Sequence, residues 1–167
     1  LDASGSMGER LAWNASYTYL DATFRTVLSV PSPNNPFSVA GEMPVERGDR
    51  LPLIPAHLLK AGLRFAATSR ISVGADVLGS ASSYFRGDEG NRAPKLDGYT
   101  LLNLRGEYRA NDNLRVYLTI DNLLDEEYET FGLFGEPDEV LGDEFDEPQF
   151  LGPGAPRAAW LGVQVSF

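Results

Sequence analysis

The chain has 167 residues, of which 43% are hydrophobic and 23% are charged, and its formal net charge is -10. This length allows one domain or a piece of one, and the acidic balance argues against a nucleic-acid partner, which requires a basic surface. Cysteine is absent, which excludes disulfides, thiolate metal sites and cysteine nucleophiles. No apolar stretch reaches the roughly 18 residues of a membrane-spanning helix, but a mean hydropathy of -0.22 is compatible with a membrane barrel, whose strands alternate.

Period-two alternation of apolar and polar side chains recurs six times and predicts an all-β fold. The predicted strands are Glu9–Leu20, Ala56–Ala67, Ile71–Phe85, Tyr99–Arg109, Leu114–Asn122 and Arg157–Phe167. Each has about the 9 to 11 residues with which a tilted strand crosses a bilayer. About the first six residues are expected to form the turn that precedes the first strand.

The connections between these strands alternate in length. Long connections over residues 21–55, 86–98 and 123–156 are separated by short ones over 68–70 and 110–113. In an outer-membrane barrel the periplasmic turns are tight and the outer loops are free to grow, whereas a soluble sandwich gives no reason for such a parity. The pattern therefore favours an antiparallel transmembrane β-barrel; a soluble, secreted β-sandwich binding module, with its apolar faces packed together, is the alternative.

Aromatic residues on the apolar faces gather at both ends of the strands. Trp13, Phe65, Tyr108 and Phe167 fall at the short-turn ends, and Tyr19 and Phe85 fall at the long-loop ends. Two rows of this kind are typical of the aromatic girdles at the two interfaces of a membrane. We therefore predict that these six residues form the membrane girdles.

The opposite face of the predicted strands is charged. Its ionisable residues are Lys60, Arg64, Asp76, Arg105, Glu107, Arg109, Arg115 and Asp121. Because small barrels fill their interior with apolar side chains, a charged inner face favours a wide lumen. Six strands cannot close such a barrel, and an open sheet would leave unpaired edges in hydrocarbon. We therefore expect about six C-terminal strands of a larger barrel.

Four segments resemble the last strands of TonB-dependent outer-membrane receptors. They are YTYLDATF (17–24), GDRLPLIPAHLLKAGLRF (48–65), LTIDNLLDEEYETFG (118–132) and PGAPRAAWLGVQVSF (153–167). The most specific pieces are DNLLDEEY at 121–128 and the PGAPR lead into a final strand that stops at Phe167. The pattern R-L-P-x-I-P-x-H from Arg50 to His57 is similar to receptors of the ferric-citrate type.

The resemblance implies part of a barrel of about 22 strands in the outer membrane of a Gram-negative bacterium, filled by a plug domain that this chain does not contain. It also implies uptake of a scarce nutrient, such as a ferric siderophore or another iron chelate, with energy from the TonB complex acting through the plug. The expected partners are outer-membrane lipid, the barrel assembly machinery, the TonB complex and the small nutrient. We expect no catalysis and no cofactor.

The closing strand has an apolar residue at every second position and an aromatic residue at the end of the chain. These residues are Leu161, Val163, Val165 and Phe167. The arrangement resembles the signal that the assembly machinery reads by strand addition. The alternative is an ordinary terminal strand with one half-buried face.

The long connections contain the remaining candidates for chemistry. The run from Asp125 to Glu147 holds eleven acids and no base. We interpret it as a solvated outer loop; the alternative is a loop that binds divalent cations. His57 is the only histidine, and we interpret it as a structural residue at the start of a strand rather than as a ligand. Tyr84, Arg86 and Arg92 are candidate ligand-facing residues, because arginine pairs well with anionic chelates; exposed loop residues without a ligand are the alternative.

Overall fold

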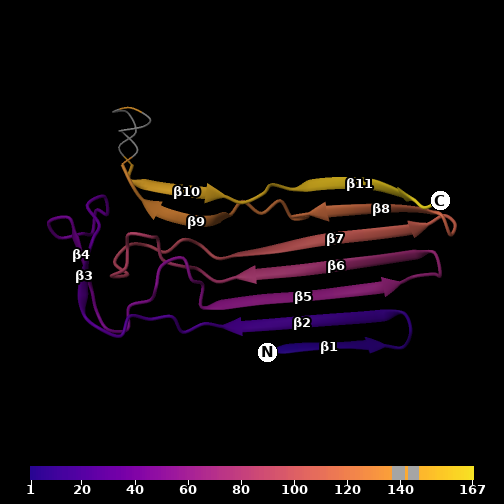
Figure 1. Ribbon diagram of the computed structural model, residues 1–167, viewed down its shortest axis with the longest axis horizontal. Coiled ribbons are helices and arrows are strands. Elements are labelled where there is room, and N and C mark those ends of the chain that lie inside the picture. Colours follow the sequence, from indigo (N-terminus) through magenta and orange to yellow (C-terminus); the bar gives the residue numbers. More distant parts are fainter. Residues whose placement is uncertain (137–141, 143–146) are drawn as a thin grey trace.

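The computed structural model describes residues 1–136, 142 and 147–167. Its main element is one curved, antiparallel sheet of seven strands in the order β1-β2-β5-β6-β7-β8-β11 (Figure 1). The sheet strands are β1 (Asp2–Met7), β2 (Leu11–Tyr19), β5 (His57–Ala66), β6 (Ile71–Ser80), β7 (Tyr99–Arg109), β8 (Leu114–Asp121) and β11 (Ala158–Val165). Two hairpins, β3 (Leu28–Pro31) with β4 (Glu42–Val45) and β9 (Glu129–Phe134) with β10 (Gln149–Pro153), lie within the long connections. Among the described residues, no helix is long and apolar enough to cross a membrane.

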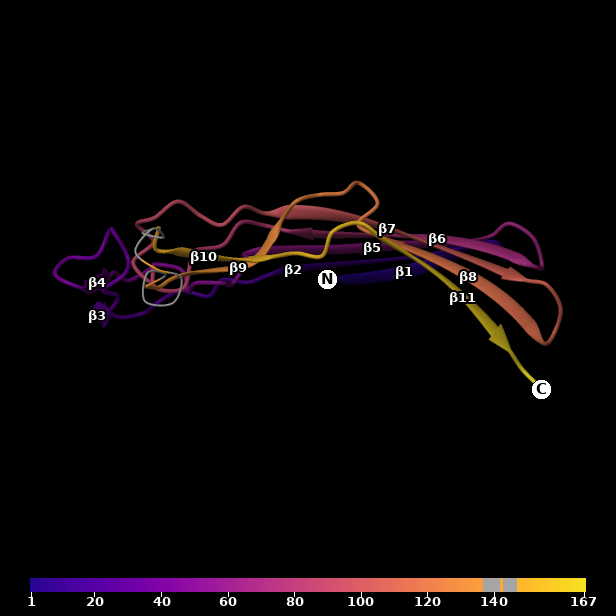
Figure 2. The same ribbon diagram turned by 90° about the horizontal axis from the view of Figure 1, so that it is seen from above.

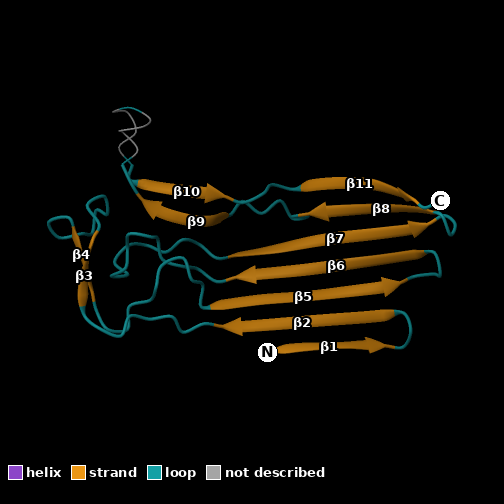
Figure 3. Cartoon of the chain, viewed as in Figure 1, coloured by secondary structure: helices purple, strands orange, loops and turns teal. Residues whose placement is uncertain are grey.

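The predicted alternation of long and short connections is confirmed. The turns that join β1 to β2, β5 to β6 and β7 to β8 are short and lie at one end of the sheet, together with the C-terminus (Figure 3). The three long connections and both hairpins lie at the opposite end. This is the arrangement in which outer-membrane strands are joined by tight periplasmic turns and extended outer loops.

The strand register separates an apolar face from a polar face. Leu63, Ala75 and Leu104 are cross-strand neighbours in one row, and Arg64 and Arg105 lie in the adjoining row. Because successive side chains of a strand point to opposite faces, each row is uniform in character. The sheet thus carries the two faces that the sequence alternation predicts.

The apolar face is not covered by other described parts of the chain. Leu63, Val73 and Leu161 are 55%, 47% and 75% exposed. Figure 2 shows the sheet as a single layer, and neither hairpin packs against its strands. The alternative of a soluble sandwich is therefore wrong for the described residues, because a sandwich buries this face against a second sheet.

The polar face is the hollowed one. A hollow of about 420 Å³ is lined by polar residues from several neighbouring strands, among them Asn14, Arg64, Asp76, Arg105 and Glu107. Within it, Arg105 Nε lies 3.5 Å from Asp76 Oδ2. A concave polar face opposite an exposed apolar face is the geometry of a barrel wall around an aqueous lumen.

The start of the chain differs from the prediction. The first residues form β1, which pairs with β2 over its whole length, rather than a turn. The alternation is weak here because Gly5 occupies an apolar-face position; a Cβ at that position would lie 3.0–3.2 Å from the indole ring of Trp13. The turn then begins at Gly8, whose φ of 64° favours glycine.

The third predicted strand is too long at its C-terminal end. β6 ends at Ser80 rather than at Phe85, and the chain then leaves the sheet. Ser83 makes an isolated bridge to Leu96 within the same connection. The apolar alternation continues beyond Ser80 because Phe85 belongs to a small core in the outer loops, not to the sheet.

Candidate functional site

The best-buried apolar side chains lie in the long connections rather than in the sheet. Phe85, Ala93, Leu96 and Phe134 form one buried cluster, and Met43 of the β3–β4 hairpin is fully buried nearby in the same loop region. We call the described parts of the connections 20–56, 81–98 and 122–157 the outer cap. The cap is therefore a packed structure with its own small core.

Polar contacts tie the connection between β2 and β5 to the connection between β6 and β7. The carbonyl oxygen of Gly87 accepts a hydrogen bond from Ser32 Oγ at 2.6 Å and one from Asn35 Nδ2 at 2.7 Å. Asn35 Oδ1 in turn accepts from the backbone N–H of Phe37 at 2.8 Å. Since Ser32 and Asn35 are both buried, these bonds hold two loops in a fixed arrangement.

Asp88 is the charged centre of this contact. Its carboxylate is buried and accepts backbone hydrogen bonds from Arg92 at 2.9 Å and from Ala93 at 3.0 Å, with Asn35 Nδ2 at 3.5 Å. Burial raises the pKa of Asp88 above its ordinary value, although these hydrogen bonds favour the ionised form. The β6–β7 connection thus folds around one acid.

The same connection also binds the third long connection. The backbone N–H of Arg86 donates to the carbonyl of Gly132 at 3.0 Å, and the N–H of Phe134 donates to the carbonyl of Arg86 at 3.1 Å. These two bonds form a parallel bridge between Arg86 and Leu133 of β9. The β6–β7 connection therefore joins all three parts of the outer cap.

A groove of about 560 Å³ lies where the three connections meet. Its lining includes Phe24, Asn34, Arg86, Glu89 and Phe134. The Arg86 side chain is exposed, while its backbone is fixed on both sides by the bridge to β9. The groove offers an anchored cation, a nearby carboxylate, an amide and aromatic surface to a ligand, a combination that suits a molecule with hydrogen-bonding edges and an apolar body.

The three predicted ligand-facing residues do not share this groove. Arg92 Nη2 pairs with Glu46 Oε1 at 3.0 Å, and Tyr84 lies beneath Lys95, whose Nζ is 4.8 Å from the ring centroid. Arg86 alone of the three lines the groove. Asn34 lies in the loop from Ser29 to Pro44, whose composition marks it as a candidate for ligand capture, whereas Phe24 and Phe134 carry no signal in the sequence because no local pattern indicates that three separate loops converge.

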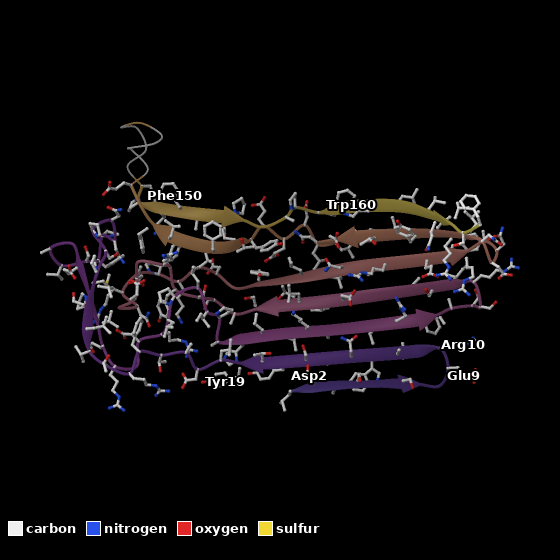
Figure 4. The ribbon with its side chains drawn as sticks, in the orientation of Figure 1. Asp2, Glu9, Arg10, Tyr19, Phe150 and Trp160 are labelled. Carbon is white, nitrogen blue, oxygen red and sulfur yellow. The ribbon has the colours of Figure 1, made fainter. Side chains whose placement is uncertain are left out.

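Five of the six predicted girdle residues lie on or beside the sheet, and the sixth, Phe85, lies in the outer cap. Trp13, Tyr19, Phe65 and Tyr108 lie in strands on the apolar face, and Phe167 lies beyond the end of β11. Figure 4 marks the two ends of β2, with Tyr19 at the loop end and Arg10 beside the short turn. Phe85 is a correction: only 4% of it is exposed, so it packs in the cap and cannot meet lipid. Contact of the other five residues with a membrane interface stays a prediction.

The closing segment forms one edge strand of the described sheet. Leu161, Val163 and Val165 pair with apolar residues of β8 and are exposed on the apolar face. The strand ends at Val165, and the backbone N–H of Ser166 donates to the carbonyl of Asn113 at 2.9 Å. Phe167 is fully exposed. Recognition of these residues by an assembly machinery stays a prediction.

The acidic run is described only in part. Asp138, Glu139, Asp143, Glu144 and Asp146 lie outside the described residues. Asp125, the first acid of the run, is not a free carboxylate, because its Oδ2 lies 3.1 Å from Arg157 Nη2. Its role is to hold the start of the third connection to the segment that precedes β11.

The two most specific segments noted in the sequence contact each other. Asn122 is buried, with a φ of 50°, and its Nδ2 donates to the carbonyls of Glu126 at 2.9 Å and Ala155 at 3.2 Å. The Asp125–Arg157 pair adds a second link between DNLLDEEY and PGAPR. Asparagine tolerates this left-handed conformation and supplies the bonds, so the motifs have a structural role at the exit from the wall.

A curved single-layer wall with an exposed apolar face, a hollowed polar face and long loops at one end defines part of a transmembrane β-barrel. Residues 1–123 match the family of TonB-dependent receptor-like β-barrels. The chain belongs to this family, whose members are outer-membrane proteins of Gram-negative bacteria. No curated protein sequence matches the chain.

Solved structures of two receptors and of a copper transporter share the fold. The siderophore receptor PiuA from Acinetobacter baumannii aligns with a TM-score of 0.72 at 19% identity, over 97% of this chain and 20% of its own. The ferric-catecholate import receptor Fiu from E. coli K12 aligns with a TM-score of 0.69 at 24% identity, over 99% and 20%. The copper transporter OprC aligns with a TM-score of 0.63 at 22% identity, over 99% and 23%. The chain therefore spans about a fifth of the length of these proteins.

Proposed function

We propose that this chain is the C-terminal wall of a receptor that carries a ferric siderophore or another iron chelate across the outer membrane. The chain supplies neighbouring wall strands and three outer loops, and the rest of the barrel and a plug belong to the parent protein. The TonB complex drives uptake by acting on that plug. The observation that carries the proposal is the groove at the junction of the three outer loops, where Arg86 is anchored.

The chemistry of the groove suits a chelate better than a bare metal ion. A ferric chelate is a bulky molecule with oxygen-rich, often anionic edges, which an arginine fork binds through paired hydrogen bonds. Phe24 and Phe134 add apolar surface for the body of such a ligand. Among the described residues, no group of three or more histidines or acids is arranged to hold a metal ion.

The decisive experiment is growth under iron limitation. A strain without the parent gene, supplied with one defined chelate at a time, is expected to lose growth on one class of ferric chelate and to regain it with the intact gene. Equal growth of both strains on every ferric chelate, with a defect on copper instead, would replace iron with copper as the proposed cargo.

Arg86→Ala tests the groove itself in the full-length receptor. The backbone bridge to β9 does not need the side chain, so the cap is expected to remain folded while affinity for the chelate falls about tenfold or more, as for the loss of a charged hydrogen bond. Arg25→Ala, an exposed arginine in the same cap, serves as the matched control. Unchanged chelate binding by Arg86→Ala would show that this groove does not bind the chelate.

We also propose that Leu161, Val163, Val165 and Phe167 are read by the barrel assembly machinery during insertion. Leu161, Val163 and Val165 are exposed in an edge strand of the described sheet, and Phe167 is exposed just beyond its end, which is the form needed for strand addition. Deletion of Phe167 from the parent protein is expected to lower its level in the outer membrane. An unchanged level would show that the segment is an ordinary terminal strand.

A further inference from the structure

A second groove lies beside the start of β5 and the end of β6, apart from the chelate groove. Its volume is about 190 Å³, and its polar lining consists of Arg50, His57, Ser82, Ser83, Tyr84 and Lys95. None of the chelate-groove residues lines it. It therefore needs a separate explanation.

The groove opens at the outer end of the apolar face. Tyr17 pairs with Leu59 on that face, and the Tyr17 hydroxyl lies 2.7 Å from His57 Nδ1. His57 therefore points to the same side of the sheet as Tyr17. The ring of Tyr19 lies 5.3 Å from the ring of His57, centroid to centroid. Rings of this kind at the end of a membrane strand occupy the level of the lipid headgroups.

The lining is positively charged although the chain as a whole is acidic. Arg50 and Lys95 supply basic side chains, and no acid is found among the described residues that line the groove. Arg50 is held in place by a 2.6 Å hydrogen bond from Nη2 to the carbonyl of Leu20, and Asp21 lies 3.8 Å from its Nη1. In the described part of the chain, Lys95 forms no salt bridge.

Neutral donors complete the lining. Ser82 and Ser83 supply hydroxyl groups, and when the Tyr17 hydroxyl donates to His57 Nδ1, the Nε2 atom carries the hydrogen and becomes a further donor. Guanidinium, ammonium and hydroxyl donors around one small groove are the groups that bind a phosphate monoester. Next to the groove, Leu59 and Tyr17 are exposed on the apolar face.

We propose that this groove binds the phosphate of an outer-leaflet glycolipid, with the acyl chains lying along the apolar face beside Tyr17 and Leu59. A lipid fits better than free phosphate, because only a ligand with an apolar tail gains from the exposed surface next to the groove. The proposal rests on the membrane location of the wall, and it goes beyond nutrient uptake. It assigns a lipid site to residues that the transport function does not use.

The test uses the full-length receptor in detergent micelles, with bisphosphorylated lipid A as the probe and inorganic phosphate in a separate arm. Lys95→Gln, alone and combined with His57→Gln, is compared with Arg70→Gln, which removes the same charge from the short-turn end. Lipid binding is measured by native mass spectrometry, and folding is checked by the thermal transition.

Lys95→Gln is expected to weaken lipid A binding about tenfold and the double variant further, whereas Arg70→Gln binds like the wild type. Growth on the ferric chelate should be unchanged in all variants, so failure of the lipid site and failure of the transport proposal give different results. Equal lipid binding by folded wild type and double variant would overturn the proposal. Binding of inorganic phosphate as tightly as lipid A would also overturn it, because the groove would then be a free-anion site.

Discussion

Asp88→Ala tests whether the outer cap is held together by one buried acid. The substitution removes the acceptor for the backbone N–H groups of Arg92 and Ala93 and for the side chain of Asn35. Ala93 is buried, so its N–H cannot turn to water without local opening. We therefore expect the connection between β6 and β7 to loosen while the sheet remains intact.

The magnitude follows from the bonds that are lost. A buried donor left without a partner costs about 1–3 kcal/mol, and a hydrogen bond to a charged acceptor contributes about 1.5–3 kcal/mol. Relief of the burial that raises the pKa of Asp88 offsets part of this loss. The net effect is a fall of about 2 kcal/mol in the free energy of local opening, which is roughly a 30-fold change in the opening equilibrium.

Hydrogen exchange of the full-length receptor, read by mass spectrometry, measures this change directly. Peptides covering residues 84–98 should exchange roughly 30-fold faster in Asp88→Ala, while peptides from β6 and β7 should not change. Asp97→Ala, at an exposed acid of the same connection, is the matched control. Unchanged exchange over residues 84–98 would refute the assignment of Asp88 as the centre of the cap.

Three further outcomes are expected. Because burial raises the pKa of Asp88, the folded cap keeps a proton that the unfolded chain releases. Opening of residues 84–98 therefore becomes easier as pH rises from the ordinary carboxyl pKa to the raised value. A hydrogen-exchange rate that does not depend on pH in this range, after correction for intrinsic exchange, would contradict this. Gly98→Leu would place a Cβ 2.5–2.9 Å from backbone atoms of Ser80, Ala81 and Ser82 and should destabilise the receptor by about 1–3 kcal/mol in thermal unfolding, whereas Gly106→Leu, with nothing within 4 Å of its Cβ, should not. Leu63→Lys on the apolar face should lower the free energy of unfolding from liposomes by about 2–4 kcal/mol in urea titrations; an equal effect of Ser72→Lys, on the polar face, would count against the assignment of the faces.

The wall could be predicted from the sequence because each of its strands repeats one local rule. Side chains two residues apart share a face, so strands such as β7 and β8 show their two faces in the residue order alone. The positions of the turns follow from where the alternation stops. β1 escaped prediction because Gly5 replaces an apolar side chain where Trp13 needs the space.

The cap could not be predicted because its contacts depend on backbone atoms and on loops that are distant in sequence. The carbonyl of Gly87 and the backbone of Arg86 join three connections, and neither leaves a pattern in residue type. Phe85 continued the alternation of β6 and was therefore assigned to a girdle, although it packs against Phe134 in the cap. Arg86 could be selected as a ligand-facing cation, but its partners in the groove could not.

We propose that the apolar face of this sheet meets lipid while its polar face lines an aqueous lumen. Ser72 and Val73 are adjacent in β6 and point to opposite faces, and the chain has no native cysteine to interfere with labelling. The test uses Ser72→Cys and Val73→Cys in the full-length receptor, with cysteines elsewhere in the parent replaced. Each variant carries a nitroxide and is placed in liposomes, where paramagnetic relaxation reports the solvent around the labelled side chain. We expect oxygen to relax the label at position 73 more strongly and a water-soluble nickel chelate to relax the label at position 72 more strongly. The reverse order, or the same environment at both positions, would contradict it.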